Sequence, residues 1–486
     1  MMRILHVCSE LYPLLKTGGL ADVAAALPPA QVRAGGDARV LLPGFPAIRA
    51  GVQGQQVVAQ VEGRFGAAAI TLLRGTLPDS GLTVYLIDAP ALYDRPGNPY
   101  ADADHRDYAD NHRRFALLGW IAAQLAQGLD PAWQPAIVHA HDWHAGLAPA
   151  YIKAAEQAEG RRIAASVLTI HNLAYQGNFP AAVFGELALP GHFYAIDGLE
   201  FHGMCSFLKA GLFYADKLTT VSGTYAREIQ RPDQGHGFDG LLRRRAADLS
   251  GILNGVDDQV WNPALDRAIP APFKLGDMAG KRAGKAALQR ECGLAVRDDA
   301  LLFCVVSRLT EQKGLHLVLD ALPAIVARGG QLMVLGAGDA GFEAQLKAAA
   351  AAQPQAVAVH LGYDEQLAHR LIAASDVIMV PSRFEPCGLT QLYGLKYGTL
   401  PLVRRVGGLA DTVVDCALEN LDVDQATGFV FDSFDGAGID AAVRRAFALY
   451  RRAADWQQVQ QCAMRQQFGW DVAAEQYLAF YRQITM

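Results

Sequence analysis

The stretch that decides the fold is SRFEPCGLTQ, residues 382–391, which follows the apolar run DVIMVP at 376–381. The apolar run has the composition of a buried parallel strand, and the residues after Thr390 indicate a helix. Glu385 is therefore expected on the loop that leaves the carboxyl end of a strand, where open α/β sheets bind ligands. Pro386 keeps Glu385 out of the helical region of the backbone. The stretch predicts an α/β fold with a ligand site beside Glu385.

The loop around Glu385 combines features that suit a sugar phosphate. Gly388 allows the backbone to approach a bound group closely. The helix that follows directs N–H groups and the positive end of its dipole at that group, which favours an anion. A surface turn with a capping acid is the alternative interpretation of this stretch.

Composition limits the class of protein. A chain of 486 residues predicts two or three domains, and 51% hydrophobic with 19% charged residues is typical of a well-packed α/β enzyme. The net charge of -6, without a basic block, makes nucleic acid and membranes unexpected partners. Seven scattered Cys form no Cys-x-x-Cys pair, so we expect free thiols and a cytoplasmic protein. The first strand begins too near Met1 for a signal peptide, and no apolar run is long enough to span a bilayer.

Apolar runs that end in polar residues recur through the first half of the chain. A strand, a glycine turn, a helix from Leu20 to about Arg33 and a second strand open a doubly wound fold. Residues 51–88 indicate a hairpin, and 111–127 a helix. Because parallel strands end at one edge of a sheet, the polar residues that follow them are expected together. The predicted strands are 3–8, 40–42, 137–141, 165–170, 217–222 and 251–257.

A second α/β series follows a Pro-rich stretch that we interpret as a linker. The predicted domains are 1–257 and 276–486, joined by 258–275, with a terminal helix at about 472–484. The strands predicted in the second series are 301–306, 331–335, 357–361, 377–380 and 400–403.

Two cationic loops are candidate phosphate sites. Lys16 stands before Gly18 and Gly19 at a helix start, although the spacing is not that of a P-loop. Arg308 and Lys313 follow the first strand of the second series, where they could neutralise a leaving diphosphate without a metal. The alternatives are a tight turn with an incidental lysine for the first loop and two solvated charges for the second.

Histidines gather after two neighbouring strands of the first half. His139 and His141 share a strand face with Asp142 and His144 just beyond, which is compatible with a metal site. No second cluster of ligands accompanies them, so we favour Asp142 as a polar contact and the two strand histidines as packing residues. His171, followed by Asn172, is the better functional candidate.

Residues 336–341, GAGDAG, match the G-x-G-x-x-G fingerprint of NAD-binding domains, with Asp364 at the distance of a ribose-binding acid. The match lies deep in the second half and not at the start of a domain. A glycine-rich turn in a nucleotide-binding half requires no nicotinamide.

Taken together and in order, these motifs resemble the bacterial glycogen synthase family of the ADP-glucose type, which is also similar to plant starch synthase. The resemblance covers nearly the whole chain and rests on residues 16–23, 141–144, 171–172, 254–257, 307–314 and 384–391. It implies two Rossmann-like domains that face each other across a cleft, the GT-B arrangement, with the terminal helix crossing back to the first domain. It further implies retaining transfer of glucose from ADP-glucose to the non-reducing end of an α-1,4-glucan, glycogen.

The resemblance also implies roles for individual residues. Arg308 and Lys313 would hold the diphosphate, Glu385 would contact the transferred glucose, and His171 would lie beside the anomeric carbon. Asp142 and Asn172 would bind sugar hydroxyls, and Tyr93 is a weaker candidate for the same site. The remaining expected contacts with the nucleotide sugar are Lys16, Gly18, Gly19, Cys387, Gly388, Leu389 and Thr390.

The chemistry fits these roles. Charge on the departing ADP needs fixed positive groups, and water must be excluded from the site, which closure of the domains would achieve. No metal or other cofactor is expected. Retention requires either a covalent intermediate or front-face attack guided by the leaving phosphate, and we favour the second because no carboxylate stands out as a nucleophile.

The chain departs from the family pattern at three positions. Val406 replaces the Thr that usually precedes Gly407 and Gly408, so a hydroxyl near the nucleotide is missing. Gly223 and His316 replace a Pro and an Asp. None of these changes removes a residue with an expected chemical role.

Three other functions compete with this interpretation. An NAD-dependent oxidoreductase would explain 336–341 but not Lys16, Arg308, Lys313 and Glu385. A glucan phosphorylase would need pyridoxal phosphate on a Schiff-base lysine. A non-catalytic glucan-binding protein would not require the cationic pair. The oligomeric state and the choice between ADP- and UDP-glucose are not specified by any residue that we can name.

Overall fold

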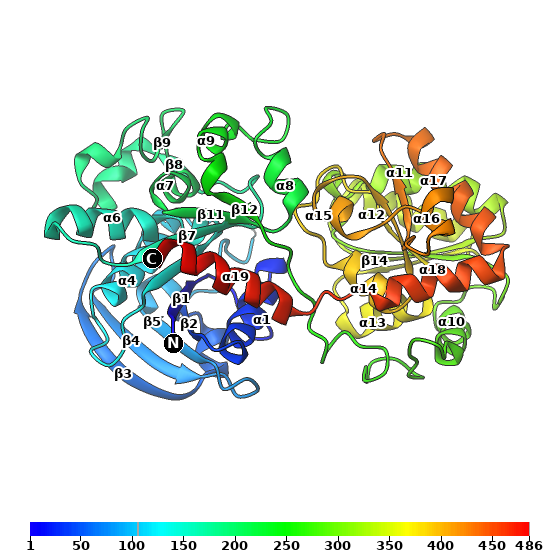
Figure 1. Cartoon of the computed structure of the whole chain (residues 1–486), viewed down its shortest axis with the longest axis horizontal. Helices are drawn as coiled ribbons and strands as arrows, with labels where there is room; N and C mark the ends of the chain where they lie inside the picture. The colour runs from blue at the N-terminus through cyan, green and yellow to red at the C-terminus, as the bar shows by residue number, and fades with distance from the viewer. Residues whose placement is uncertain (105, 486) are drawn as a thin grey trace. The chain divides into compact units, whose positions relative to one another are not determined.

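The computed structural model describes residues 1–104 and 106–485. The chain forms two compact units (Figure 1). Unit 1 consists of Met1–Gly255 together with Trp470–Met486, and unit 2 consists of Val256–Gly469. Within the described ranges, no helix combines the length and the apolar character needed to cross a lipid bilayer.

Unit 1 is built on a nine-stranded sheet with the order β12-β11-β7-β6-β1-β2-β5-β4-β3. The pairs from β12 to β5 are parallel, whereas β4 is antiparallel to β5 and to β3, which confirms a hairpin in residues 51–88. A small antiparallel sheet has the order β8-β10-β9. The strands are β1 (Arg3–Val7), β2 (Asp37–Pro43), β3 (Gln53–Glu62), β4 (Ala69–Thr76), β5 (Thr83–Asp88), β6 (Ile137–His141), β7 (Ala165–Ile170), β8 (Asn178–Pro180), β9 (Glu200–Phe201), β10 (Met204–Ser206), β11 (Lys217–Thr220) and β12 (Leu249–Gly251).

Helices cover both faces of the large sheet. Successive side chains of a strand point to opposite faces, so the apolar residues of a strand pack against helices on both sides. On β1, Leu5 and Val7 belong to the core that α4 and α6 close, whereas Ile4 packs with residues of α1 and α19. The helices of unit 1 are α1 (Gly19–Arg33), α2 (Pro46–Gly51), α3 (Pro90–Tyr93), α4 (Asn111–Ala126), α5 (Asp142–Ala145), α6 (Leu147–Glu159), α7 (Phe207–Tyr214), α8 (Gly223–Glu228), α9 (Asp239–Arg244) and α19 (Trp470–Thr485), with short 3-10 turns η1 (Ala181–Glu186), η2 (Gly191–Phe193) and η3 (Ala246–Asp248).

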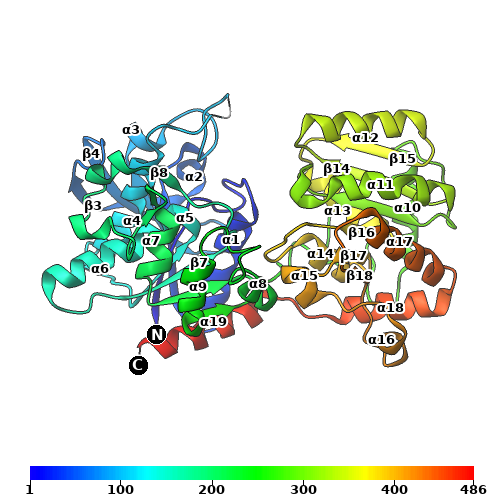
Figure 2. The same ribbon diagram turned by 90° about the horizontal axis from the view of Figure 1, so that it is seen from above.

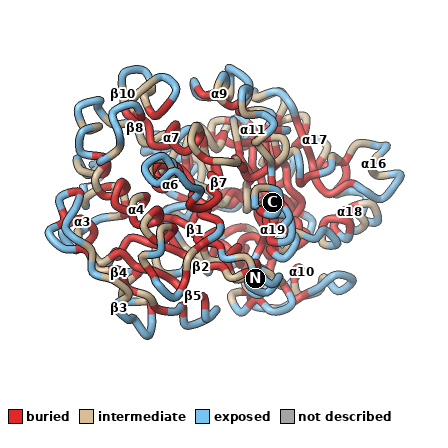
Figure 3. Tube along the Cα trace, turned by 60° about the vertical axis from the view of Figure 1, so that its left-hand side comes forward, coloured by how far each residue is buried: buried red, intermediate tan, exposed pale blue. Residues whose placement is uncertain are grey.

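The C-terminal helix α19 is part of unit 1 and lies along α1 (Figure 1). Its buried face contributes Trp470, Tyr477 and Tyr481 to the core beneath the sheet. The central strands β6 and β7 are buried along their whole length, as is typical of parallel strands covered by helices on both faces. Figure 3, which colours the trace by burial, shows that the exposed parts of the chain are mainly outer loops.

Unit 2 has a six-stranded, wholly parallel sheet with the order β15-β14-β13-β16-β17-β18. Its strands are β13 (Leu302–Val306), β14 (Gln331–Gly336), β15 (Val357–Leu361), β16 (Val377–Val380), β17 (Leu400–Arg404) and β18 (Phe429–Phe431). Helix α11 packs on α17 and α10 packs on α13 (Figure 2). The helices are α10 (Ala279–Glu291), η4 (Glu311–Lys313), α11 (Leu315–Ala327), α12 (Ala340–Ala352), α13 (Glu365–Ala374), α14 (Thr390–Lys396), α15 (Gly407–Thr412), α16 (Leu418–Asp422), α17 (Gly436–Tyr450) and α18 (Ala453–Arg465).

The stretch 258–275, which we expected as a linker, lies within unit 2. The ring of Trp261 stacks on that of His369 with centroids 3.7 Å apart. Asp266 Oδ2 accepts a hydrogen bond from the Tyr397 hydroxyl at 2.6 Å and pairs with His369 Nδ1 at 2.7 Å. These buried contacts tie the stretch into the core of unit 2, which its Pro-rich composition does not reveal.

The prediction of a strand at 251–257 is wrong. The strand β12 ends at Gly251, and residues 252–257 continue without strand pairing in the large sheet. A Cβ on Gly251 would lie 2.2 Å from the carbonyl oxygen of Ser222, so close backbone packing explains the glycine.

Candidate active site

Both units place polar residues at the point where the strand order of the sheet reverses. In unit 1, β1 lies between β2 and β6, and in unit 2, β13 lies between β14 and β16. Open α/β sheets bind ligands outside the carboxyl ends of strands at such a switch point. The strands β6 and β7 deliver Asp142 and His171 there, and β13 and β16 deliver Arg308 and Glu385.

Asp142 fixes the backbone that follows β7. Its φ of 55° is unusual for a residue other than glycine. Its Oδ1 accepts hydrogen bonds from the backbone N–H of His171 at 2.7 Å and of Asn172 at 3.3 Å. Burial raises the pKa of the Asp142 carboxyl to about 7, although these two N–H groups oppose the shift. Asp142 therefore holds the two expected sugar-binding positions together.

His171 is half-buried beside Asp142 and carries no charge at neutral pH. Burial lowers the pKa of its imidazole to about 3. Its Nε2 lies 2.9 Å from Nδ1 of His141. Asn172 accepts a hydrogen bond from the backbone N–H of Ala174 through its side-chain oxygen, which shapes the turn after His171.

The glycine turn before α1 is organised by Glu10, which the sequence analysis missed. The Glu10 carboxylate accepts hydrogen bonds from the backbone N–H groups of Thr17 at 2.6 Å and Gly18 at 3.2 Å. Lys16 forms an ion pair with Asp22 at 2.9 Å. An acid between the first strand and a glycine-rich turn is the signal that could have identified Glu10.

Tyr93, a weaker candidate for the sugar site, is buried. Its side chain is 1% exposed, and its hydroxyl donates to the backbone oxygen of Arg114 at 2.7 Å. Its aromatic ring belongs to the core of unit 1, and this burial does not favour the expected role in sugar binding. Tyr100 in the same loop hydrogen-bonds to Glu10 instead.

In unit 2, Lys313 and Glu385 meet across the switch point. Lys313 Nζ donates to Glu385 Oε2 at 2.6 Å, and Ser382 Oγ donates to the same oxygen at 2.8 Å. Glu385 is 6% exposed. A buried carboxylate requires such partners, and the pairing aligns the lysine with the loop after β16. The two residues that the sequence predicted to act on one ligand are thus brought together.

Arg308 is exposed on the loop after β13, and the glycines of residues 336–341 support that loop. A Cβ on Gly336 would lie 1.9 Å from the Ser307 carbonyl oxygen, and one on Gly338 would lie 2.4 Å from that of Leu309. The glycines that match the NAD-binding pattern are therefore needed for close packing against the loop that carries Arg308. Asp364, which lies at the position expected of a ribose-binding acid, caps α13 by accepting a hydrogen bond from the backbone N–H of Leu367.

The loop from Glu385 to α14 is held by a second glycine turn. Gly388 has a φ of 72°, and Cys387 is buried, with Leu389 and Thr390 half-buried beside them. A Cβ on Gly407 would lie 1.9 Å from the Glu385 carbonyl oxygen, so only glycine fits there. Val406 precedes this turn as the residue before α15 and supplies no side-chain cap.

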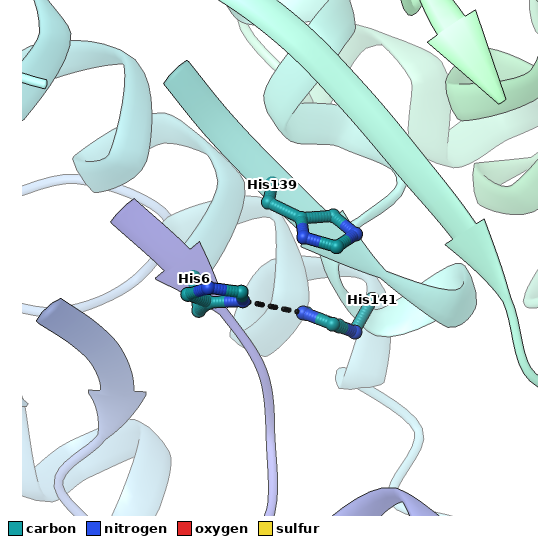
Figure 4. Close-up of side chains that lie close together, drawn as sticks. All are labelled: His6, His139 and His141. Carbon is teal, nitrogen blue, oxygen red and sulfur yellow. Dashed lines mark hydrogen bonds between the residues drawn. The ribbon is translucent and has the colours of Figure 1, made fainter. Parts of the chain in front are cut away.

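Three buried histidines of unit 1 lie close enough to be considered as metal ligands. One ring nitrogen from each of His6, His139 and His141 lies within 4.8 Å of the others (Figure 4). Both ring nitrogens of each already have a hydrogen-bond partner, namely Gln31, Tyr481, Thr169, His171 or another histidine of the group. A metal ion would have to replace these bonds, and the arrangement favours a hydrogen-bonded cluster.

Comparisons with known proteins identify the families that the chain resembles. The model of the starch synthase catalytic domain matches residues 3–244, and the model of group 1 glycosyl transferases matches residues 293–460. The catalytic domain of starch synthase IV from Arabidopsis thaliana, solved with ADP and acarbose, has a TM-score of 0.89 at 30% identity over 100% of this chain and 99% of that one. A sucrose-phosphate synthase from Thermosynechococcus elongatus, at 16% identity and a TM-score of 0.60, shares the fold.

The fold and the two sites define a glycosyltransferase of the GT-B class, with two Rossmann-like units. The glycogen synthase of Variovorax paradoxus is 61% identical over 99% of both chains, and that of Francisella tularensis subsp. novicida is 58% identical over 100% of this chain and 99% of its own. The chain belongs to the glycogen synthase family. It transfers glucosyl units in glycogen synthesis, and the oxidoreductase alternative is not supported.

Proposed function

We propose that the donor is ADP-glucose and that glucose is transferred with retention to the non-reducing end of an α-1,4-glucan. The observation that carries this proposal is the full-length similarity to a starch synthase domain that binds ADP and acarbose. ADP is the leaving product of this reaction, and acarbose is a glucan-like oligosaccharide. The chain has the groups for both ligand chemistries, cations in unit 2 and polar side chains after β6 and β7 in unit 1.

In unit 2, Arg308 and Lys313 bind the diphosphate and stabilise the charge that develops as ADP leaves. Fixed positive groups lower the barrier most when they meet charge that appears in the transition state. Glu385 contacts the transferred glucose and holds Lys313 in place through the 2.6 Å bond. Gly388 and its neighbours line this part of the site, namely Cys387, Leu389 and Thr390.

In unit 1, Lys16 contacts a phosphate of the donor, beside Gly18 and Gly19. Asp142 and Asn172 bind sugar hydroxyls, and His171 lies next to the anomeric carbon. The Asp142 bond to the His171 backbone fixes the position of both the ring and the carbonyl group of His171. The carbonyl oxygen can stabilise positive charge on the anomeric carbon during front-face attack.

We further propose that transfer needs no metal ion and takes place in the cytoplasm. Arg308 and Lys313 supply the positive charge that a metal would otherwise bring to the diphosphate. All seven cysteines have free thiols, which suits a reducing compartment.

The test is release of ADP from ADP-glucose, measured with and without glycogen, with EDTA present and UDP-glucose in parallel. We expect release that depends on glycogen, persists in EDTA and is much faster for ADP-glucose. Faster release from UDP-glucose would overturn the donor assignment. Loss of activity in EDTA that returns with an added divalent metal would overturn the metal-independent proposal.

A further inference from the structure

A continuous line of hydrogen bonds runs from α1 to His171 through two buried histidines. Gln31 Oε1 lies 2.7 Å from His6 Nε2, and His6 Nδ1 lies 3.0 Å from His141 Nε2 (Figure 4). His141 Nδ1 lies 2.9 Å from His171 Nε2. Gln31, His6 and His141 are each 0% exposed, so no water competes for these bonds. We call this series the histidine relay.

Each histidine of the relay is neutral, so each has one ring N–H and one ring acceptor. Burial lowers the pKa of His6 to about 4 and of His171 to about 3, and it holds the pKa of His141 well below the ordinary value. In a neutral imidazole, the nitrogen that carries the proton is set by the partners of both nitrogens. The proton position on one ring therefore determines that on the next.

Gln31 sets the direction of the relay. Its side-chain NH2 donates to the Tyr481 hydroxyl at 3.2 Å, and that hydroxyl lies 2.7 Å from His139 Nδ1, to which it can donate. The carboxamide is thereby oriented with its oxygen towards His6, and an oxygen only accepts. His6 must carry its proton on Nε2 and accept on Nδ1.

The same logic continues to the end of the relay. His141 donates from Nε2 to His6 Nδ1, which leaves its Nδ1 as an acceptor. His171 then donates from Nε2 to His141 Nδ1. Its own Nδ1 is left with a free electron pair, and no partner for that atom is found within residues 1–104 and 106–485.

We propose that Gln31, His6 and His141 are positioning residues that lock His171 in its Nε2–H tautomer, so that Nδ1 accepts a hydrogen bond from a hydroxyl of the transferred glucose. This inference rests on the proposed place of His171 in the site. A tautomer with Nδ1–H would present a donor where the sugar also offers a donor, or would lose the bond to His141. The relay thus selects both the orientation and the hydrogen-bonding character of the ring.

The test is 15N NMR of the imidazole nitrogens in protein labelled with 15N-histidine, with the His171 signals assigned by their loss in His171→Gln. At neutral pH we expect His171 to show a protonated Nε2 and an unprotonated Nδ1. A protonated Nδ1 in the wild-type protein would overturn the proposal, whether or not the enzyme uses ADP-glucose. The spectrum therefore separates failure of the relay from failure of the proposed function.

Two substitutions of the same residue form a matched pair. His6→Asn keeps a side-chain oxygen near the position of Nδ1 that can accept from His141, whereas His6→Leu does not. We expect His171 to remain a single tautomer in His6→Asn and to become a mixture in His6→Leu. Gln31→Met, which leaves all three rings in place but removes the anchoring acceptor, gives the same test if His6→Leu does not fold. A single Nε2–H tautomer of His171 in every folded acceptor-free variant would overturn the proposal.

Activity gives a second readout. We expect kcat of His6→Leu to fall on the order of tenfold, because a misoriented ring no longer meets the sugar, with less change in KM for the donor. His6→Asn should recover most of that loss. Equal loss in both variants at equal thermal stability would mean that the ring of His6 matters for packing and not for the relay.

Discussion

Lys313 is the residue whose contacts most directly support a role in charge stabilisation. Lys313→Ala removes a cation from the proposed diphosphate site and leaves the buried Glu385 with Ser382 as its remaining hydrogen-bond donor among the contacts described above. We expect kcat to fall about 10²- to 10³-fold, since a fixed group that meets developing charge contributes about that much. Steady-state kinetics with ADP-glucose and glycogen measure the effect.

The control for this prediction is Lys347→Ala, which removes an exposed lysine from α12 of the same unit. It should leave kcat unchanged. Near-normal turnover by Lys313→Ala, with a circular dichroism spectrum like that of the wild type, would remove Lys313 from the catalytic account.

Asp142 makes a prediction about pH. Burial raises the pKa of its carboxyl to about 7 from the ordinary 3.8, so the folded state holds the proton to higher pH than the unfolded chain. The stability that this proton contributes is complete below about pH 4 and is lost as the pH rises towards about 7. Asp142→Asn keeps an oxygen for the two backbone N–H groups and does not ionise.

As the pH rises, the free energy of unfolding of Asp142→Asn should therefore increase relative to that of the wild type. The difference should reach at most about a few kcal/mol, the free energy that corresponds to the shift of the Asp142 pKa. Urea unfolding at pH 4.5, 6 and 8 would measure the difference between the two proteins. A constant difference across this range would show that Asp142 is ionised throughout.

Residues at strand ends were the part of the site that the sequence could predict. Asp142, His171, Arg308 and Glu385 follow apolar runs, and a parallel sheet brings such positions to one edge. His6 and Gln31 could not be predicted in the same way. The His6 contacts depend on the register of β1 against β6, and the Gln31 contact with Tyr481 joins residues 450 positions apart.

At the scale of elements, the stretch 258–275 should behave as core and not as a flexible connection. Asp266 accepts from the Tyr397 hydroxyl and pairs with His369, both buried. Asp266→Ala leaves these partners without their acceptor, and we expect a loss of about 3 kcal/mol in the free energy of unfolding. Urea denaturation followed by tryptophan fluorescence would report it, because Trp261 stacks on His369.

Asp299→Ala is the matched control, since the side chain of Asp299 is 75% exposed and pairs with Arg297 at the surface. It should leave the free energy of unfolding close to that of the wild type, because a surface ion pair contributes little. If Asp266→Ala were equally mild, the stretch would be the loosely held linker that its composition suggests.

Most elements were predictable because their apolar period is strong, and the errors have physical causes. The strand expected at 251–257 ends at Gly251, where backbone packing against Ser222 leaves no room for a side chain. Tyr93 lies in a stretch of polar and aromatic residues, yet its ring is part of the core and its buried hydroxyl donates to the Arg114 carbonyl oxygen. Neither outcome is encoded in local composition.

At the scale of the whole molecule, both units repeat one design, a parallel sheet whose switch point carries the polar groups. The chain enters unit 2 after Gly255 and returns after Gly469, so α19 completes the core of unit 1. The central claim is that both sets of residues serve one transfer of glucose.

The most direct test of that claim is NMR of the product formed from ADP-glucose with 13C-labelled glucose and maltoheptaose, in the presence of EDTA. The account predicts one α-1,4-linked labelled glucose at the non-reducing end for each ADP released. Labelled glucose that appears free in solution, or in β linkage, would contradict it, because the first means hydrolysis and the second means inversion.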